Sequence, residues 1–385
     1  MAKRVAIVGA GQTRCRSSRK DVSGQELINE AVLAALADAD LTRDDIDAIV
    51  IGNMDHFEGI NYVDTWSVDG SGGVMKPILK VTTGGTTGTT VAMAAYYHVA
   101  SGLFDRVLAI GWEKNSESDT TGAIITAFDP VFDRPTFGGA VGGLAAVATR
   151  YMHLTGATQQ DAARVAVRDR KHALSNPYAH LHLDITIDDV MKSPMISHPI
   201  KYLDMCPRTD GACAVVFASE DYAEKITSKP AWVLGTINRH NYAFSYDPSW
   251  DHLESLSEAT TKLYAKLGIK EPLKEIDVAE LYTPSSFAGL AWVEDLGLCR
   301  RGEGPRYSAD GFFDMNGELP INPSGGVLST NPIGATGLQR VAEATLQIMG
   351  RADQRQVPDV KTALVTGFGG CFWSDVMMLG ARKPH

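Results

Sequence analysis

The chain has 385 residues, of which 44% are hydrophobic and 21% are charged, and its formal net charge is −10 at pH 7. This length exceeds one ordinary hydrophobic core and predicts two similar halves or domains. The acidic balance argues against general nucleic-acid binding, which needs a basic face. The lack of any apolar run of about 18 residues argues against a membrane span.

Targeting, disulfide and metal signals are also missing from the sequence. Residues 1–9 are typical of a short strand and not of a signal peptide. Five scattered cysteines give no disulfide framework and suit a reducing compartment. No C-x-x-C or H-E-x-x-H pattern appears, and His180-Leu-His182 has no companion ligands. We therefore expect a cytoplasmic protein with no metal site and with neither a nucleic-acid nor a membrane partner.

The first elements along the chain are a strand and a helix. Residues 5–11, Val-Ala-Ile-Val-Gly-Ala-Gly, predict a buried strand that ends in a glycine turn. The third glycine of a G-x-G-x-x-G motif is missing, and Cys15-Arg16 stands where a helix would have to begin, which argues against a dinucleotide site. Residues 23–39 then predict an amphipathic helix, and residues 41–52 predict a turn and a strand.

The order of these elements recurs in the second half of the chain. Residues 260–281 repeat the helix, the turn with Ile-Asp and the strand that residues 23–52 show first. Residues 361–367 likewise repeat the strand predicted at 106–111. An internal duplication of this length predicts two stacked α/β halves, not a solenoid.

Two helices are predicted between these repeats. Residues 80–102 predict a loop rich in glycine and threonine that passes into a helix. Residues 158–173 predict a helix rich in arginine, for whose basic residues, Arg168 and Arg170 among them, a solvated face is the default expectation.

Two cysteines flank Asp210-Gly211, where residues 200–217 predict a strand. Free cysteines are usually buried, so we expect Cys206 and Cys213 to pack in a core. Asp210 is expected to fix the turn before the strand.

A second loop that passes into a helix lies at residues 322–337. Asn331-Pro332 predicts an extended turn, because the residue before a proline avoids the α region. Gly334 allows backbone to come close to whatever lies opposite. Thr336 is expected to cap the helix, whose first N–H groups would be free to meet an oxyanion or a thioester carbonyl.

The motifs of this loop carry a family resemblance. Residues 331–337, Asn-Pro-Ile-Gly-Ala-Thr-Gly, resemble the thiolase-superfamily motif His-Pro-x-Gly-Ala-Thr-Gly, with Asn331 in the place of the His. Residues 322–326 resemble that family's Asn-x-x-Gly-Gly. The resemblance covers nearly the whole chain and implies the thiolase-like α/β fold, two duplicated halves stacked as αβαβα layers. The implied halves are residues 1–250, with a loop insertion at about 115–200, and residues 251–385.

The resemblance also shows where this chain departs from the family. The nucleophilic cysteine of thiolases falls on Gly85, so the usual acyl-cysteine chemistry cannot begin there; only the hydroxyls of nearby threonines remain. Tyr282 takes the place of the family's Asn or His after the second Ile-Asp strand. The family's second cysteine falls on Thr366, and Cys371 lies further round the same glycine loop. Cys371 is either a thiolate favoured by the backbone amides of that loop or a packed thiol.

The resemblance therefore implies a site in which Cys371, Asn331 and Tyr282 carry the chemistry. The residues expected to contact the substrate are Gly85, Ser324, Gly325, Gly334 and Gly370. Coenzyme A is implied as a co-substrate, and no bound cofactor is expected.

Three functions stay open. The first is a non-standard thiolase that cleaves a branched or aromatic 3-oxoacyl-CoA with CoA, or runs the reverse condensation, and the near-intact loop at 331–337 favours it narrowly. The second is a retro-aldolase that cleaves a 3-hydroxyacyl-CoA, with Tyr282 as the proton carrier. The third is a non-catalytic subunit that binds acyl-CoA. The aromatic residues at 242–246 and 372–373 suggest an apolar acyl pocket.

The resemblance implies partners as well. Thiolase-like chains of this kind form homodimers, and some pair with a small zinc-ribbon/OB-fold subunit in a heterotetramer. Since this chain contains no zinc ribbon, such a subunit would be a separate protein.

Overall fold

The computed structural model describes residues 2–60, 62–135, 138–241, 252–370 and 373–384. The strands are β1 (Val5–Gln12), β2 (Ala48–Gly52), β3 (Ile78–Val81), β4 (Arg106–Lys114), β5 (Met195–Ser197), β6 (Ile200–Lys201), β7 (Asp210–Ser219), β8 (Ala231–His240), β9 (Val278–Glu280), β10 (Thr362–Phe368) and β11 (Trp373–Gly380). Within the described ranges, nine of them form one mixed sheet in the order β3-β2-β4-β7-β1-β8-β11-β10-β9, and β5 pairs with β6.

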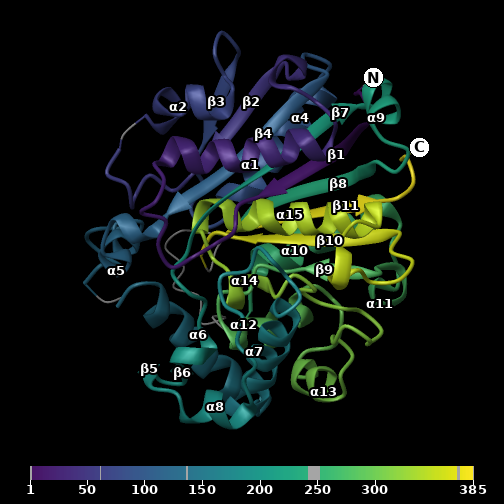
Figure 1. The fold of residues 1–385 in the computed structure, drawn as a ribbon. Helices are drawn as coiled ribbons and strands as arrows, with labels where there is room; N and C mark the ends of the chain where they lie inside the picture. Colours follow the sequence, from purple (N-terminus) through teal and green to yellow (C-terminus); the bar gives the residue numbers. More distant parts are fainter. Residues whose placement is uncertain (1, 61, 136–137, 242–251, 371–372, 385) are drawn as a thin grey trace.

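The helices connect these strands (Figure 1). They are α1 (Gly24–Asp38), α2 (Val63–Trp66), α3 (Val68–Ser71), α4 (Thr87–Ala100), α5 (Thr120–Ile125), α6 (Ala140–Thr155), α7 (Gln159–Ala173), α8 (Ile187–Lys192), α9 (Glu220–Ile226), α10 (Glu254–Leu267), α11 (Pro272–Glu275), α12 (Ser286–Asp295), α13 (Gly304–Ala309), α14 (Gly326–Ser329) and α15 (Ile333–Met349). Short 3₁₀ turns occur at Arg43–Asp45, Asn115–Glu117, Tyr202–Asp204 and Asp353–Arg355. No helix in these ranges is both long and apolar enough to cross a bilayer.

The predicted duplication is confirmed by the strand order. The first half runs β3-β2-β4-β7-β1 and the second runs β9-β10-β11-β8, so β2, β4, β7 and β1 correspond to β9, β10, β11 and β8. In each half the first two of these strands are parallel and the third is antiparallel to the second. The two halves join where Ala6 and Ile7 of β1 pair with Trp232 and Ala231 of β8.

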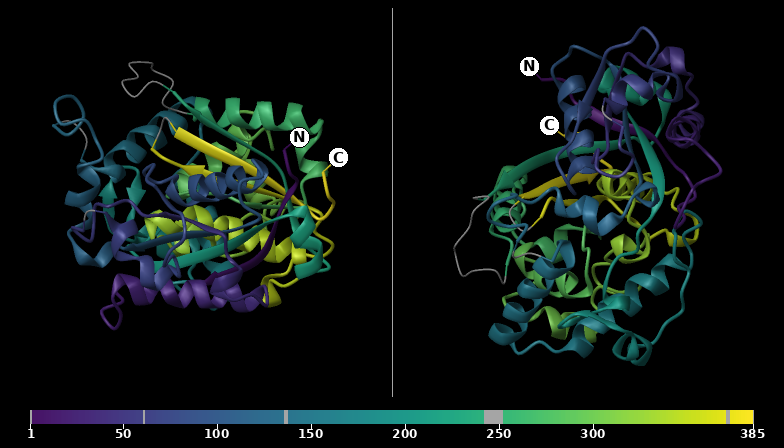
Figure 2. Two further views of the ribbon diagram at one scale, coloured as in Figure 1. Left: turned by 90° about the horizontal axis from the view of Figure 1, so that it is seen from above. Right: turned by 90° about the vertical axis from the view of Figure 1, so that its left-hand side faces the viewer.

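The helices form the layers that the family resemblance implies. Helices α4 and α15 pack against each other between the strands of the two halves, and each also contacts β4 and β10. Helix α1 covers β1 and β7 on one outer side, and α10 covers β8 and β11 on the other (Figures 1 and 2). The αβαβα arrangement is therefore confirmed.

The glycines of β1 serve helix packing. A Cβ atom added at Gly11 would lie 2.2 Å from the backbone N of Ala35 in α1, so only a glycine allows this close approach. Helix α1 begins as predicted, with Ser23 and Glu26 forming a capping box. The expected glycine turn is therefore part of β1 itself, where it allows a helix to pack closely, and it is not a phosphate-binding loop.

The segment between β4 and β7 forms a separate group of helices. Helices α6, α7 and α8 lie below the sheet in Figure 1, together with α12, α13 and α14 of the second half. The helix predicted at 158–173 is confirmed as α7, but the solvated basic face is confirmed only in part: Lys171 is exposed and the Arg164 side chain is 39% exposed, whereas Arg168 is 6% exposed and Arg170 is 1% exposed. Arg168 and Arg170 are buried because α7 packs against α12 and α14. The predicted boundary between residues 250 and 251 touches the undescribed range and stays a prediction.

Candidate active site

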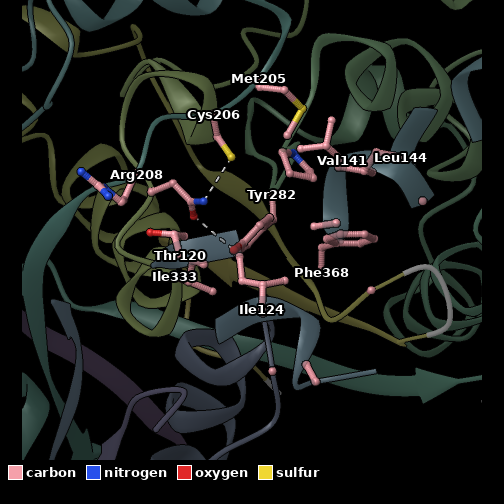
Figure 3. A pocket seen from close by; sticks show the side chains of 18 of the residues that line it. Thr120, Ile124, Val141, Leu144, Met205, Cys206, Arg208, Tyr282, Ile333 and Phe368 are labelled. Atoms are coloured by element: carbon pink, nitrogen blue, oxygen red, sulfur yellow. Dashed lines mark hydrogen bonds between the residues drawn. The ribbon is translucent and has the colours of Figure 1, made fainter. Parts of the chain in front are cut away.

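A cavity of about 1350 Å³ lies where both halves meet the group of helices below the sheet. It exceeds the roughly 300–1,000 Å³ of ordinary small-molecule pockets, so it has room for a large ligand. The first half contributes the loop that contains Gly85, the second contributes Tyr282, Asn331 and Phe368, and α6 contributes Val141 and Leu144. The predicted Tyr282 and Asn331 therefore meet in one cavity (Figure 3).

The side chain of Asn331 is held in one orientation. Its Oδ1 accepts hydrogen bonds from Tyr282 Oη at 3.2 Å and from Thr336 Oγ1 at 2.8 Å. Its Nδ2 donates to Cys206 Sγ at 3.2 Å. Two hydroxyl donors on the carbonyl side leave the NH₂ group turned toward Cys206, and the dashed lines of Figure 3 trace this connection from Tyr282 to Cys206. Asn331 therefore presents a fixed, neutral hydrogen-bond donor.

Tyr282 directly follows β9, and its phenol is buried beside Asn331. Its backbone N–H donates to Thr366 Oγ1 at 2.9 Å, and its ring lies 6.1 Å from the ring of Phe368 between centroids. Burial raises the pKa of the Tyr282 phenol well above its ordinary value, and the neighbouring Cys206 adds to the effect. The phenol therefore stays protonated at neutral pH and acts as a donor.

Gly85 occupies the place where thiolases carry the nucleophile, and backbone fills that place. A Cβ atom at Gly85 would lie 2.2 Å from the carbonyl oxygen of Phe368 in β10 and 3.6 Å from Tyr282 Oη. No side chain fits there without a backbone shift. Apart from the adjacent residues 84 and 86, the nearest polar side-chain group to that point among the described residues is the Tyr282 phenol.

The threonines beside Gly85 do not replace the missing cysteine. None of Thr86, Thr87, Thr89 and Thr90 lines the described cavity wall, and their hydroxyls are engaged by nearby backbone carbonyls or by Asp375. Thr86 donates to Thr83 O, Thr87 to Gly84 O, and Thr89 and Thr90 to both Thr86 O and Asp375 Oδ2.

Cys206 is a site residue that the sequence analysis placed wrongly. It was expected in a core, but the structure puts it in the cavity wall, half-buried, with its sulfur beside Asn331. Burial raises the pKa of the Cys206 thiol to about 11, although the Asn331 amide and the Arg170 charge oppose that rise. Only folding brings residues 206 and 331 together, so the sequence contained no signal for this contact. Cys213 is buried in β7 as predicted.

Cys371 lies outside the described residues, as do Phe372 and the aromatic stretch at 242–246. Its catalytic role therefore stays a prediction. Gly370, the residue before it, lines the cavity with a φ of +83°.

His180 is a second residue that the sequence analysis passed over, because it seemed a loop residue without companion ligands. It lines the cavity, and its Nδ1 lies 3.0 Å from Thr209 Oγ1. That hydroxyl oxygen also accepts the backbone N–H of Asn331 at 3.2 Å. Burial lowers the pKa of the His180 imidazole, so it is neutral at pH 7.

The remaining residues predicted to contact the substrate lie away from the cavity. Ser324 donates through its N–H and its hydroxyl to Glu280, at 3.0 and 2.8 Å. Gly325 has a φ of +89° and packs against Ala173. Gly334 donates its N–H to Glu113 Oε2 at 2.8 Å. None of the three lines the described cavity wall, whereas Gly85 and Gly370 do.

Two expectations about the start of α15 need correction. Thr336 does not cap the helix: it lies in the first turn and donates to Asn331 and to Pro332 O. Three of the first N–H groups are engaged, because those of Ala335 and Thr336 bond to Pro332 O and that of Gly334 bonds to Glu113, which leaves only that of Ile333, a cavity residue, of those expected to be free. The turn is tighter than predicted, and its role is to set the Asn331 side chain.

Glu113 anchors this turn from the first half. Its carboxyl group accepts the N–H groups of Met54 and Gly334. Burial raises the pKa of the Glu113 carboxyl well above its usual range, and the neighbouring Glu58 adds to the rise. Among the described residues, no group of His, Cys, Asp and Glu side chains is placed to hold a metal ion.

Comparison with known proteins gives a consistent result along the whole chain. The family model described as "Thiolase, N-terminal domain" matches residues 5–221, and "Thiolase C-terminal domain-like" matches residues 237–381. The acetyl-CoA acetyltransferase of Methanothermobacter thermautotrophicus is 32% identical over 95% of this chain and 96% of its own length. The 17-hydroxy-3-oxo-4-pregnene-20-carboxyl-CoA lyase of Mycobacterium tuberculosis is 31% identical over 96% of this chain and 97% of its own length.

Among solved structures, the Ltp2-ChsH2(DUF35) aldolase resembles this chain along almost its full length. The TM-score is 0.85 with 30% sequence identity, and the match covers 99% of this chain and 98% of the other.

Proposed function

The chain belongs to the thiolase family and is an enzyme of acyl-CoA carbon–carbon bond cleavage, and from that premise we propose that it splits a 3-hydroxyacyl-CoA by a retro-aldol reaction. The reaction yields an aldehyde or ketone and a shortened acyl-CoA, and it consumes no free CoA. Two similarities favour this choice over thiolysis: one relative is a CoA-ester lyase, and one similar structure is an aldolase.

The observation that carries the proposal is the filled position at Gly85. Thiolysis through an acyl-enzyme needs a nucleophile at the substrate carbonyl. The carbonyl oxygen of Phe368 lies 2.2 Å from the point where a side chain at Gly85 would begin, and the Tyr282 phenol lies 3.6 Å from that point. A retro-aldol cleavage needs no nucleophile, but it needs hydrogen-bond donors for an enolate, and Tyr282 and Asn331 are such donors.

The proposed bond changes follow from these donors. A base takes the proton of the 3-hydroxyl group, and the bond between C2 and C3 breaks as the new carbonyl forms. The electron pair moves into the thioester, whose enolate oxygen accepts a hydrogen bond from Asn331 Nδ2. C2 of the enolate then takes a proton from Tyr282. The proton held by the base returns to Tyr282, so the enzyme ends as it began.

His180 is the proposed base. It lines the same cavity, and Thr209 links its ring to the backbone of Asn331. Its lowered pKa keeps the imidazole neutral and able to accept a proton at pH 7. When Nδ1 donates to Thr209 Oγ1, Nε2 carries the lone pair that accepts the hydroxyl proton.

The cavity wall favours a bulky, branched or aromatic acyl group. The ring of Phe368 lies 4.6 Å from that of Trp292 between centroids, at an interplanar angle of 35°, and Ile124, Val141 and Leu144 add apolar surface. Burial of such surface contributes about 25 cal/mol per Å² to binding.

Product analysis by mass spectrometry tests the proposal. The wild-type enzyme receives matched branched or aromatic 3-hydroxyacyl- and 3-oxoacyl-CoA esters, each with and without free CoA. We expect a ketone or aldehyde from the hydroxy ester at the same rate in both conditions. Cleavage of the oxo ester alone, and only with free CoA, would refute the proposal.

Thiolysis is the second candidate, and one observation favours it. The Cys206 thiol lies in the cavity with its sulfur 3.2 Å from Asn331 Nδ2, so a thiol does meet the site from another loop. Trapping with an oxo ester followed by peptide mass spectrometry tests this route. An acyl group on Cys206 would support it; CoA-dependent cleavage of the oxo ester by Cys206→Ala at the wild-type rate would exclude it.

Partners complete the proposal. The similar aldolase structure includes a DUF35 subunit, which supports a small zinc-ribbon/OB-fold partner for this chain. A homodimer is supported by β3, an edge strand beside exposed apolar side chains: Leu79 is 45% exposed, Trp66 is 63% exposed and Met75 is 99% exposed. Light scattering of the purified chain, alone and co-expressed with the candidate subunit, measures both associations. We place the complex in the cytoplasm.

A further inference from the structure

Arg208 is a cation at the cavity wall that no side chain among the described residues neutralises. The residue is exposed, and its guanidinium forms no hydrogen bond or ion pair with any described residue. It lies two residues from Asp210, but that carboxylate is already engaged by the N–H groups of Arg19 and Ser116, at 2.8 and 2.9 Å. The chain as a whole has a net charge of −10 and repels anions. An arginine without a described partner in a large cavity therefore creates a local site that attracts an anion.

The backbone at Arg208 is well anchored. Arg16 and Asp210 exchange two backbone hydrogen bonds, from Arg16 N at 3.2 Å and from Asp210 N at 2.7 Å. Ser17, next to Arg16, also lines the cavity, and Arg16 is exposed. An anchored backbone that carries a guanidinium without a described partner suits phosphate binding, because arginine can bind two phosphate oxygens at once.

The opposite part of the cavity is apolar. Figure 3 shows Arg208 on one side of the Cys206–Tyr282 group, and Val141, Leu144 and Phe368 on the other. The residues proposed to react lie between these two ends. The cavity is thus divided into a cationic end, a reacting centre and an apolar end.

We propose that an acyl-CoA lies across this cavity in one direction, with the phosphates of its CoA part at Arg208 and its acyl group against Val141, Leu144 and Phe368. This inference rests on the proposed acyl-CoA chemistry, and it assigns Arg208 as the residue that distinguishes a CoA ester from a thioester without phosphates. Arg170 also lines the cavity, but it is buried and donates to Leu328 O and to Met205 O. The acidic residues Asp119, Asp133 and Glu254 line other parts of the wall and disfavour anions there.

Calorimetric binding of CoA, dephospho-CoA and pantetheine to the wild type and to Arg208→Ala tests the cationic end without any turnover. Because Arg208 is exposed, we expect the variant to bind CoA about tenfold more weakly. Pantetheine, which lacks phosphate, should bind both proteins equally. Dephospho-CoA, which lacks the 3′-phosphate, locates the contact. If wild type and Arg208→Ala bind it equally, Arg208 contacts the 3′-phosphate; if the variant binds it more weakly, Arg208 contacts the diphosphate.

Arg150→Ala is the matched control, since Arg150 is exposed on α6 outside this cavity and the charge change is the same. We expect it to bind CoA like the wild type. Equal weakening in both variants, equal weakening for pantetheine, or no weakening of CoA binding by Arg208→Ala would each overturn the proposal.

The apolar end is tested by Leu144→Trp, with Val141→Phe as a second variant because Val141 is only half-buried and tolerates a larger side chain. Both should weaken binding of a bulky acyl-CoA severalfold while leaving the affinity for free CoA unchanged. If these variants weakened the binding of free CoA by the same factor, the CoA part would lie against these residues, and the proposed direction of the acyl-CoA would be wrong. These affinities can be measured even when no substrate is turned over. The binding experiments can therefore refute this inference without deciding whether the retro-aldol reaction occurs.

Discussion

The starts of α4 and α15 occupy equivalent places in the two halves, but their side chains form hydrogen bonds with different consequences for the cavity. Before α4, Gly85 offers no side chain and the nearby threonine hydroxyls donate to backbone carbonyls or to Asp375. In the first turn of α15, Thr336 donates to Asn331, the residue two positions before the helix, and fixes its amide toward the cavity. The duplicated backbone survives in both halves, but the second half alone presents a reacting group at this point.

Each loop is held by a carboxylate from the other half. Asp375 of β11 accepts the hydroxyls of Thr89 and Thr90 in α4, at 2.8 and 2.7 Å. Glu113 of β4 accepts the N–H of Gly334 in α15. Buried carboxylates are costly unless they are hydrogen-bonded, so each is a strong constraint on the loop it holds. The comparison teaches that the two halves stabilise each other's loops while one of them supplies the chemistry.

The largest effect on activity should come from removing a proposed reacting group in the second half. Tyr282→Phe removes only the phenol oxygen, and we expect kcat/KM for the hydroxy ester to fall by about 10²- to 10⁴-fold, because a positioned proton donor is lost. Asn331 keeps its bond from Thr336, so the fold should persist. Tyr264→Phe is the control: its buried hydroxyl bonds to Leu296 O at 3.1 Å, and its loss should leave kcat/KM unchanged. Equal activity of Tyr282→Phe and wild type would remove Tyr282 from the mechanism.

Placing the family's nucleophilic cysteine at position 85 in the first half should not produce thiolysis. In Gly85→Cys the new Cβ would meet the carbonyl oxygen of Phe368 at 2.2 Å. Backbone must move, and we expect the free energy of unfolding to fall by about 1–3 kcal/mol, with no gain of thiolysis. Denaturant unfolding measures the loss. Gly142→Cys in α6, outside the cavity, is the control, because apart from its chain neighbours and its own helix backbone no described atom lies within 4 Å of its added Cβ. A stable Gly85→Cys variant with CoA-dependent cleavage would show that only the cysteine is missing.

The pH dependence of kcat/KM should report the base. His180 accepts a proton only when neutral, so activity is lost as the pH falls through its pKa. Burial lowers that pKa, which places the acid limb below the ordinary value of about 6.5. His180→Gln should lower kcat/KM by about 10²-fold and abolish this limb. An unchanged limb in the variant would assign it to another group.

The smallest effect concerns the carboxylate that holds the second loop. The pKa of Glu113 is higher in the folded than in the unfolded chain, so the folded state binds more protons above the unfolded value of about 4.3. Stability is therefore full at lower pH and declines as the pH rises toward the folded pKa. Glu113→Gln should flatten this decline in unfolding experiments between pH 5 and about pH 8. Glu224→Gln, at an exposed ion pair with Lys383, should leave it unchanged.

Much of the fold could be predicted because its signals are local. The amphipathic helix at 23–39, the paired Ile-Asp strands and the glycine loops each depend on a few neighbouring residues, and all appear in the structure. The absence of a nucleophile at Gly85 followed from the family resemblance in the same way. What the structure adds there is the reason, since backbone of β10 fills the space.

The contacts that complete the site join distant segments and left no local pattern. Cys206 meets Asn331 across 125 positions in the sequence, and Arg170 is buried because α7 packs against other helices. Thr336 could not be told from a helix cap, because capping and bonding to Asn331 use the same hydroxyl. Sequence patterns give local geometry, whereas burial and pairing depend on what the fold brings opposite.

The central claim is that the carbon–carbon bond breaks without a thiol. The most direct measurement counts free CoA thiols while the wild-type enzyme cleaves an accepted CoA ester, with the carbonyl product quantified in the same samples. A retro-aldol reaction predicts one ketone or aldehyde per turnover and an unchanged thiol count. The loss of one free thiol for each bond cleaved would contradict the account and assign the chain to thiolysis.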